Sequence, residues 1–182
     1  MSTKVYFDER TGKVVVRGIT VAPGSMDLKY KHFAGDPTDT NEAGKQNFCV
    51  KISEEDAEKL QKDLEAHNLF LNIKKDKYED TYFKIVISDS ATITRMKPGR
   101  TAPFAIDPKD TDMMRSIDKA LIADGAISCS PCYLKKYSRW TCYLSSMWFI
   151  PCVDPVQEEI DAAEFEHPSE EDVYPTNEVP FE

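Results

Sequence analysis

Short hydrophobic runs separated by polar turns recur along the chain, and this pattern predicts a protein built mainly from β-strands. Residues 13–21 (KVVVRGITV), 47–52 (NFCVKI) and 81–88 (TYFKIVIS) are rich in β-branched and aromatic residues. Similar patterns occupy residues 26–33, 69–73 and 91–96. About six or seven short strands with few βαβ repeats predict an antiparallel barrel or sandwich. Residues 1–12 are polar and predict a loose lead-in.

Residues 26–33 alternate strictly in sequence. Met26, Leu28, Tyr30 and His32 share one predicted face, and Asp27, Lys29, Lys31 and Phe33 share the other. The alternation predicts a half-buried strand whose outer face is basic.

Two helices interrupt the strands. Ser53 is followed by three acids, an N-terminal signature, and Ala57, Leu60 and Leu64 form a buried stripe. A shorter helix is predicted near residues 111–121, with Met114, Ile117 and Leu121 as its stripe and Gly125 as its stop.

Residues 127–150 read as two strands joined by a basic turn. Lys135, Lys136 and Arg139 supply the charge, and Tyr137 and Trp140 lie beside them. The second strand, residues 140–150, carries no charge, so other parts of the fold must cover it. Cations and rings at the tip of such a hairpin are typical of a nucleic-acid groove.

Charge divides the chain into two parts. The formal net charge is -9, but residues 153–182 hold 11 acids and no Lys or Arg, which leaves residues 1–152 with a formal +2. A segment of high charge and low hydrophobicity predicts disorder. We therefore expect a body of residues 1–152 and an acidic, disordered tail of residues 153–182.

The chain shows no signal-peptide pattern and no apolar run near the ~20 residues of a membrane span, so we expect a cytoplasmic protein. Its five cysteines are an odd number, and reduced thiols are the expectation in that compartment.

Residues 32–52 (HFAGDPTDTNEAGKQNFCVKI) resemble the pattern Asn-Phe-Ser-Gly … Asn-x-x-Gly-x-Arg-Asn-Phe-x-Val-x-Ile of phage single-stranded-DNA-binding proteins. The matching positions are Phe33, Gly35, Asn41, Gly44, Lys45, Asn47, Phe48, Val50 and Ile52. The closing half is similar at Tyr133, Trp140, Tyr143, Leu144, Met147, Trp148 and Ile150. The resemblance spans roughly residues 19–150 and implies an OB-fold, a partly open Greek-key barrel that binds oligonucleotides on one face. It also implies that the protein coats and protects single-stranded DNA during replication or recombination.

Basic and aromatic residues on predicted outer faces and loops are the candidate DNA contacts. Cations would track phosphates, and rings would stack on any base, so binding would be largely sequence-independent. The candidates are Lys29, Lys31, Phe33, Lys45, Tyr82, Lys84, Arg95, Lys97, Arg100, Lys135, Lys136, Tyr137, Arg139 and Trp140. For each residue taken singly, a solvated surface or core role competes with this interpretation.

The tail ends in an apolar tip that follows acids, similar to the tip of bacterial single-stranded-DNA-binding proteins. Its candidate partner-binding residues are Glu171, Asp172, Glu178, Val179, Pro180 and Phe181. Phe181 could fill a pocket on a replication or recombination protein while the acids meet its basic rim, or the acids could compete with DNA. The alternative is a plain solubilising tail. The chain could also form a homo-oligomer.

The cysteines raise two further alternatives. Cys129-Ser130-Pro131-Cys132 has the spacing of a thiol-disulfide oxidoreductase, but that motif needs a helix after it, and here a turn and strand follow. Cys129, Cys132, Cys142 and Cys152 could in principle bind zinc, although the last two lack a second short spacing. We expect neither metal nor cofactor.

Catalytic signatures are otherwise absent from the sequence. We expect no enzyme. The competing hypotheses are an oxidoreductase that uses Cys129 and Cys132, and a protein-only interaction module that uses the tail.

Overall fold

The computed structural model describes residues 3–22 and 25–152, and the predicted tail lies outside them. The strands are β1 (Lys4–Asp8), β2 (Lys13–Arg17), β3 (Val21–Ala22), β4 (Ser25–Met26), β5 (Leu28–His32), β6 (Asn47–Lys51), β7 (Ile73–Lys75), β8 (Thr81–Val86), β9 (Thr92–Lys97), β10 (Thr101–Ile106), β11 (Ile122–Leu134) and β12 (Arg139–Pro151). The helices are α1 (Glu54–Glu65), α2 (Thr111–Lys119) and the short 3-10 helix η1 (Lys135–Tyr137).

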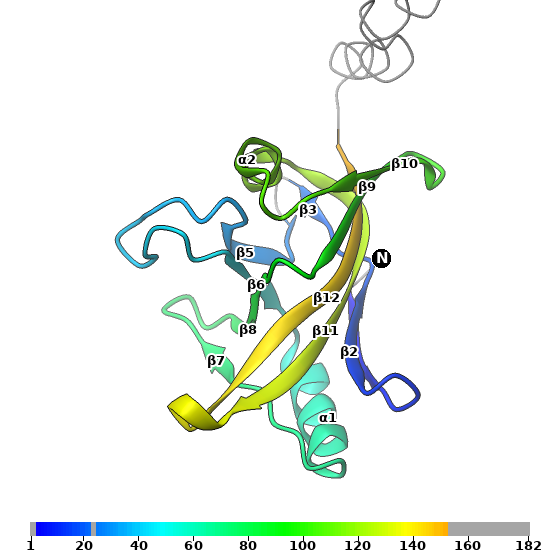
Figure 1. The fold of residues 1–182 in the computed structure, drawn as a ribbon. Coiled ribbons are helices and arrows are strands. Elements are labelled where there is room, and N and C mark those ends of the chain that lie inside the picture. The colour runs from blue at the N-terminus through cyan, green and yellow to red at the C-terminus, as the bar shows by residue number, and fades with distance from the viewer. Residues whose placement is uncertain (1–2, 23–24, 153–182) are drawn as a thin grey trace, which may run out of the picture. The chain divides into compact units, whose positions relative to one another are not determined.

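The strands of the described ranges form one sheet that returns on itself. Its main path runs β1-β2-β11-β12-β8-β6-β5. Val21 of β3 pairs with Ile122 of β11, and the chain then passes through β4 into β5, which pairs with β6 (Figure 1). The predicted mainly-β, OB-like barrel is confirmed. Its pairing is not purely antiparallel, because β12 runs parallel to β8 and to β9.

Helix α1 begins and packs as its sequence predicts. The Ser53 hydroxyl accepts a hydrogen bond from the Asp56 amide at 3.1 Å, and Ala57, Leu60 and Leu64 are buried. In Figure 1, α1 lies at the lower end of the molecule and α2 at the upper end. Helix α1 packs against β1, and α2 packs against β5.

Helix α2 is shorter than predicted. It buries Met114 and Ile117 and ends at Lys119, so Leu121 lies beyond it and is exposed. Gly125 is not the helix stop but a residue of β11. A Cβ atom at Gly125 would meet the Trp148 carbonyl oxygen at 2.7 Å and Ile19 side-chain carbons at 2.8 Å. The glycine is therefore needed for close packing of the hairpin against residue 19.

Two further predictions are corrected by the pairing. Residues 4–8 of the expected lead-in form β1, which pairs with β2 along its whole length. Of the predicted strand at residues 69–73, only Ile73 belongs to a strand. The preceding residues form no strand: Leu71 is buried in the core, and the Phe70 side chain is 39% exposed.

The alternation predicted for residues 26–33 fails at Tyr30. This residue has φ +49°, and the pairing of β5 with β6 shifts register between Lys29 and His32. Such a bulge exchanges the two faces of the strand beyond it. Tyr30 is consequently exposed, whereas Phe33 is fully buried and stacks on Phe48 with ring centroids 4.7 Å apart.

Candidate nucleic-acid interface

A groove of about 710 Å³ lies on the outer face of the barrel. Its floor comes from β6 and β8, whose outward side chains include Asn47, Cys49 and Val86. The Phe70–Asn72 segment forms part of one wall, and the first residues of β12 form part of another. Thr40 and Asn41, from the loop between β5 and β6, line a further part of the groove.

Four aromatic rings line the groove. Tyr30 and Tyr82 meet edge to face, with centroids 5.9 Å apart, and Tyr30 is 44% exposed. Phe70 is 39% exposed. Trp140, at the start of β12, is half-buried, and its ring centroid lies 5.5 Å from that of Tyr133. The Asn72 side-chain amide donates to the Trp140 carbonyl at 3.2 Å, which ties the Phe70–Asn72 wall to the hairpin.

The charge of the groove has one sign. Among the described residues that line it, Lys74, Lys77, Lys84 and Arg139 are the charged ones, with His32 beside them and no Asp or Glu. Lys74, Lys84 and Arg139 are exposed, so their charges reach solvent at the groove surface. Such a lining attracts an anion, and the rings offer flat apolar faces next to each cation.

The tip of the β11–β12 hairpin extends the basic surface. Lys135, Lys136 and Tyr137 form η1 and are all exposed. Two cations lie near the Tyr137 ring, with the Lys136 amine 5.3 Å and the Arg139 guanidinium 5.1 Å from its centroid. The tip therefore adds a ring and two further cations beside Arg139.

Lys29 does not lie on an open basic face, and that prediction is wrong. It is 7% exposed, and its amine donates to Asp76 and, at 2.7 Å, to Asp80. Burial lowers the Lys29 pKa, but the hydrogen bonds to the two carboxylates outweigh it, so its pKa is raised. Tyr30 also donates to Asp76, at 3.0 Å. This cluster fastens the turn between β7 and β8 to β5 and thereby fixes the wall that carries Lys74 and Lys77.

Acid should weaken this anchor. The hydrogen bond from Lys29 holds the Asp76 pKa well below its ordinary value. The ionised Asp76 therefore stabilises the folded protein fully above the pKa of an unfolded carboxyl group, about 3.9. That stability is lost as the pH falls through the pKa of Asp76 in the folded protein. We expect Asp76→Asn to be less stable than the native chain at pH 7 and the difference to shrink below about pH 4. Urea unfolding midpoints of both proteins between pH 7 and pH 3 measure this difference in stability.

Asp89→Asn, at an exposed carboxylate, is the matched control for that experiment. Its midpoint should follow the native chain at every pH. If Asp76→Asn were as stable as the native chain at pH 7, the contacts of Asp76 with Lys29 would not contribute to stability.

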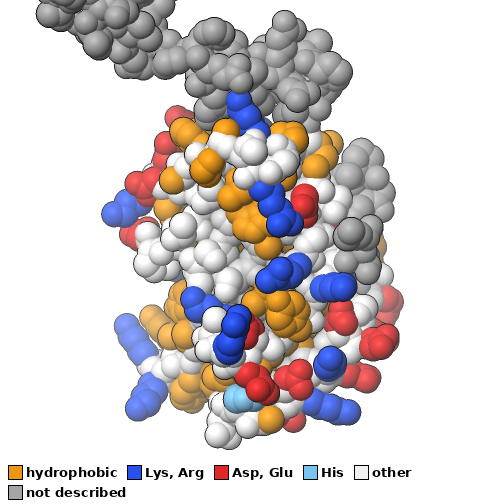
Figure 2. Space-filling model, turned by 90° about the vertical axis from the view of Figure 1, so that its right-hand side faces the viewer, with side chains coloured by type: hydrophobic (Ala, Val, Ile, Leu, Met, Phe, Trp, Pro, Cys, Tyr) orange, Lys and Arg blue, Asp and Glu red, His pale blue; other side chains and the backbone are white. Residues whose placement is uncertain are grey.

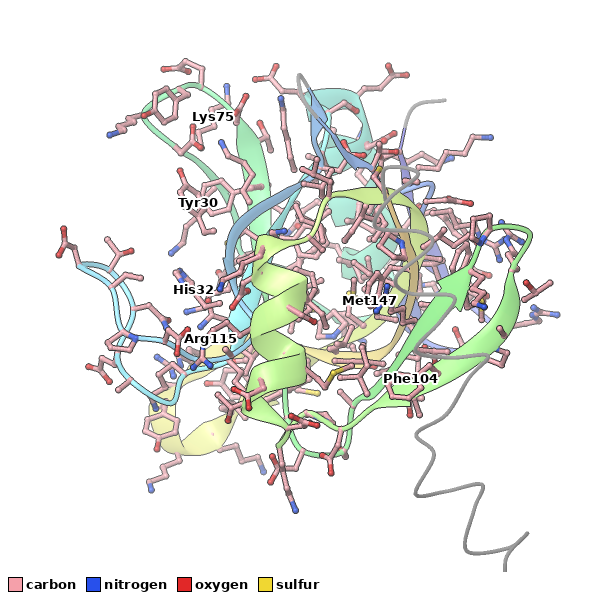
Figure 3. The ribbon with its side chains drawn as sticks, turned by 90° about the horizontal axis from the view of Figure 1, so that it is seen from above. Tyr30, His32, Lys75, Phe104, Arg115 and Met147 are labelled. Carbon is pink, nitrogen blue, oxygen red and sulfur yellow. The ribbon has the colours of Figure 1, made fainter. Side chains whose placement is uncertain are left out.

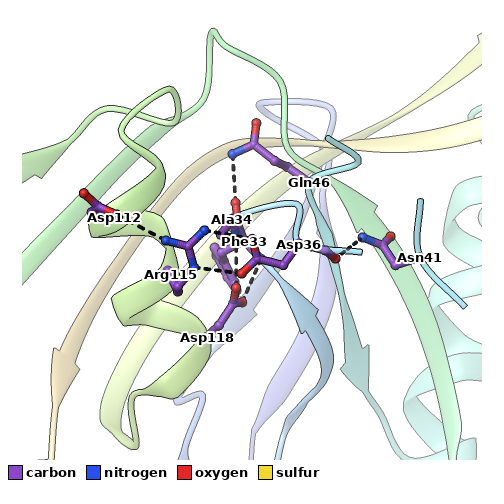
Figure 4. Close-up of polar contacts among 8 residues, drawn as sticks. All are labelled: Phe33, Ala34, Asp36, Asn41, Gln46, Asp112, Arg115 and Asp118. Atoms are coloured by element: carbon purple, nitrogen blue, oxygen red, sulfur yellow. Dashed lines mark hydrogen bonds and ion pairs between the residues drawn. The ribbon is translucent and has the colours of Figure 1, made fainter. Parts of the chain in front are cut away.

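Polar contacts also hold the loop between β5 and β6 in place (Figure 4). Arg115 of α2 donates to both carboxylate oxygens of Asp36, each at 2.8 Å. Asp118 accepts from the backbone amides of Phe33 and Ala34, at 2.7 and 3.1 Å. Gln46 donates at 2.8 Å to the carbonyl oxygens of Phe33 and Pro108. Helix α2 is thus a fixed support for the loop.

The asparagines and glycines of the resemblance motif have a structural explanation in this loop. Asn41 donates to the carbonyls of Asp36, Glu42 and Lys45, and Asn47 donates to the Asn41 side chain at 3.0 Å. Gly35 has φ +74°, and a Cβ there would meet Gly44 at 3.1 Å, so the two glycines let the loop ends approach each other.

The structure brings some of the predicted DNA contacts together. Tyr82, Lys84, Arg139 and Trp140 line the groove, and Lys135, Lys136 and Tyr137 lie at the adjoining tip. Lys45 is exposed in the loop whose Asn41 lines the groove. These residues come from three separate stretches of sequence.

Other predicted contacts lie elsewhere. Phe33 is a core residue with no exposed surface, so the prediction that it stacks on a DNA base is wrong. Lys31 donates to the carbonyls of Ile117 and Ala120 at the end of α2, at 3.0 and 2.9 Å, and burial lowers its pKa. Arg95, Lys97 and Arg100 belong to the β9–β10 hairpin, away from the groove.

Sequence reasoning missed several groove residues. Tyr30 and His32 were assigned to the inner face because the bulge at Tyr30 leaves no mark in the alternation. Phe70 and Lys77 lie in loops, and Lys74 lies in the three-residue strand β7, which is too short for alternation to assign a face. Seen from above, Tyr30 and His32 point away from the barrel on the same side (Figure 3).

The cysteines do not form the sites that their spacing allowed. Cys129 and Cys132 are three positions apart on β11, so their side chains point to opposite faces. The hydrogen bond with Cys142 and burial raise the Cys129 pKa, and burial raises the Cys132 pKa, whereas redox catalysis needs a lowered one. Within the described ranges, no three His, Cys, Asp or Glu side chains are grouped as metal ligands would be.

The barrel and its groove thus define an OB-like protein with an aromatic and basic face. In the part of the chain that the structure describes, no helix is long and apolar enough to cross a membrane. No protein-family model matches the chain, and no curated protein sequence matches it.

Solved structures of one phage protein are similar to the chain. A C-terminally truncated single-stranded DNA-binding protein from bacteriophage Enc34 has a TM-score of 0.47 at 12% identity, over 80% of this chain and 90% of that one. Its complex with single-stranded DNA gives 0.45 at 11%, over 80% and 90%. A further structure of the protein gives 0.44 at 12%, over 84% and 92%. The resemblance seen in the sequence is confirmed, but similarity at this level does not establish function.

Proposed function

We propose that the protein binds single-stranded DNA in the groove, largely without sequence preference. The observation that carries this proposal is the lining itself: four rings and four Lys or Arg side chains, without a carboxylate among the described lining residues. Stacking on a ring is worth about 1–3 kcal/mol per base and accepts any base, while cations neutralise the backbone. A flexible polyanion with exposed flat bases is the ligand that satisfies both kinds of group.

The position of the groove in the fold supports the same ligand. OB-folds bind oligonucleotides on the face of their second and third strands and on the loops after the first and fourth strands. In this barrel, β6 and β8 take the place of the second and third strands. The loop between β5 and β6 and the tip of the β11–β12 hairpin take the place of the two loops. All four contribute to or adjoin the groove.

The wider role that we propose is to coat exposed strands during replication or recombination and protect them from hairpin formation and nucleases. The tail of residues 153–182 would recruit partner proteins, with Phe181 as anchor and the neighbouring acids meeting a basic surface. This second activity needs no contribution from the groove. It is therefore tested separately, by mixing Phe181→Ala with purified replication proteins.

A fluorescence titration of oligo-dT tests DNA binding in the full chain, followed through its two Trp residues. Replacing both Lys84 and Arg139 by Ala should weaken binding at low salt. It should also reduce the slope of log K against log salt by about 1.4, because each lost phosphate contact on a single strand removes about 0.7. Replacing Lys135 and Lys136 should reduce the slope in the same way.

The matched control is Lys4→Ala with Arg10→Ala, which removes two exposed cations from β1 and the turn after it, at the far end of the sheet path. Its affinity and slope should equal those of the native chain. No binding by the native chain at any salt would leave a protein-only interaction module. Tighter binding of an oligo-U than of oligo-dT would assign the groove to RNA.

A further inference from the structure

The β9–β10 hairpin is basic but lies outside the groove. Residues 90–106 contain Arg95, Lys97 and Arg100 and no acid. Residues 101–105 of β10 are all exposed, and β10 pairs only with β9 within the described residues. Seen from above, Phe104 lies on the side of the barrel opposite Tyr30 and His32 (Figure 3).

Two rings lie on or beside this hairpin, Phe104 of β10 and Trp148 of the neighbouring β12. The Arg100 guanidinium lies 4.6 Å from the centroid of the Trp148 ring and remains 65% exposed, with Asp124 at 3.7 Å. Phe104 is 39% exposed. Figure 2 shows Lys and Arg side chains lying among hydrophobic ones in the upper half of this side of the molecule. The surface therefore repeats the combination of cation and ring that lines the groove.

One strand connects the two places. β12 begins at the groove with Trp140 and reaches β9 at residues 146–149, as its diagonal course in Figure 1 shows. Trp140 and Trp148 are eight residues apart, which is about 26 Å along a β-strand.

The outer face of this stretch of the β11–β12 hairpin is uncharged. On β12 its residues are Thr141, Tyr143 and Ser146, and on β11 the residues paired with these are Cys132, Ser130 and Ser128. Ser146 is exposed and Tyr143 is half-buried. No carboxylate lies among these six residues, and the nearest one on β11, Asp124, lies beyond them and pairs with Arg100 at 3.7 Å.

We propose that the β9–β10 hairpin, with Arg100 and Trp148, is a second contact for the same DNA strand, which leaves the groove and follows the outer face of β11 and β12. This rests on the proposed function of the groove. Guanidinium groups bind phosphates through paired N–H donors, and exposed rings accept a base. A path of about 26 Å is compatible with the sites of about 4–16 nucleotides that OB-folds cover.

An oligonucleotide length series tests the second contact. An oligo-dT of about 4 nucleotides, the smallest site of an OB-fold, can fill the groove alone, and one of about 20 exceeds the span of a single OB-fold and can reach both contacts. Lys97→Ala with Arg100→Ala should leave the short ligand within twofold of the native affinity. The same variant should bind the long ligand about tenfold more weakly at low salt, with a slope smaller by about 1.4.

Two further variants keep the test specific. Arg100→Lys keeps the charge but loses the planar donor group, so it should recover most of the salt slope and only part of the affinity. Lys4→Ala with Arg10→Ala removes the same charge from β1 and the turn after it and should change neither ligand. Urea midpoints equal to that of the native chain show that each variant is folded.

The outcomes separate the two proposals. Equal loss for both lengths, or no loss for the long one, would overturn the second contact while the groove stands. If replacing Lys84 and Arg139 leaves the short ligand unaffected, the groove proposal itself fails.

Discussion

Trp140→Ala should bind oligo-dT about 10- to 100-fold more weakly than the native chain, because one stacking contact is worth about 1–3 kcal/mol. The ring lines the groove beside Arg139. Stacking is not screened by salt, so the loss should persist at high ionic strength, where the cation variants and the native chain converge. Affinities measured over a salt series make this comparison.

Trp140→Phe is the control for this prediction. It keeps a ring in the groove and should retain most of the affinity. With an oligo-dT too short to reach Trp148, much of the fluorescence change on binding should also disappear in Trp140→Ala, since Trp148, the other of the two tryptophans, lies about 26 Å away along β12. A loss of affinity that vanished at high salt would argue against stacking.

Phe33→Ala should lower the free energy of unfolding by about 3–5 kcal/mol, the range for truncating a buried Phe. The ring has no exposed surface and stacks on Phe48 in the core. Urea unfolding with an unchanged m-value measures the loss. DNA affinity, corrected for the folded fraction, should remain near that of the native chain.

Phe33→Leu keeps most of the volume and should lose clearly less stability, which guards against a variant that fails to fold. A Phe33→Ala chain as stable as the native one, with weakened DNA binding, would restore the surface stacking role that its place in the sequence suggested. The two variants thus show whether the Phe33 side chain stabilises the core or contacts DNA.

Alternation located the groove residues on regular strands. Tyr82 and Lys84 occupy the outward positions of β8, and the neighbouring Phe83 and Ile85 are buried, as period-two patterning requires. The β11–β12 hairpin and its basic tip could also be predicted from the sequence, since they depend only on residues close together in the chain. Both α-helices were found from their buried stripes, and α1 also from its Ser53 cap.

The remaining differences have physical causes that act beyond local pattern. A single left-handed residue, Tyr30, reverses the faces of β5, and tyrosine gives no warning of that conformation. Lys29 is buried because two carboxylates some fifty residues later fold over it. Arg95 and Lys97 fall outside the groove because β9 pairs with the distant half of β12, which only the topology reveals.

The pairing of Val21 with Ile122 joins residues 101 positions apart and completes the ring of strands. Closing so long a loop costs conformational entropy before any contact compensates for it, so this step should come late in folding and limit its rate. The β11–β12 hairpin has mostly local pairs and can form early. We therefore expect slow folding in the millisecond-to-second range of β-rich proteins, with the seam between β3 and β11 as the last part to assemble.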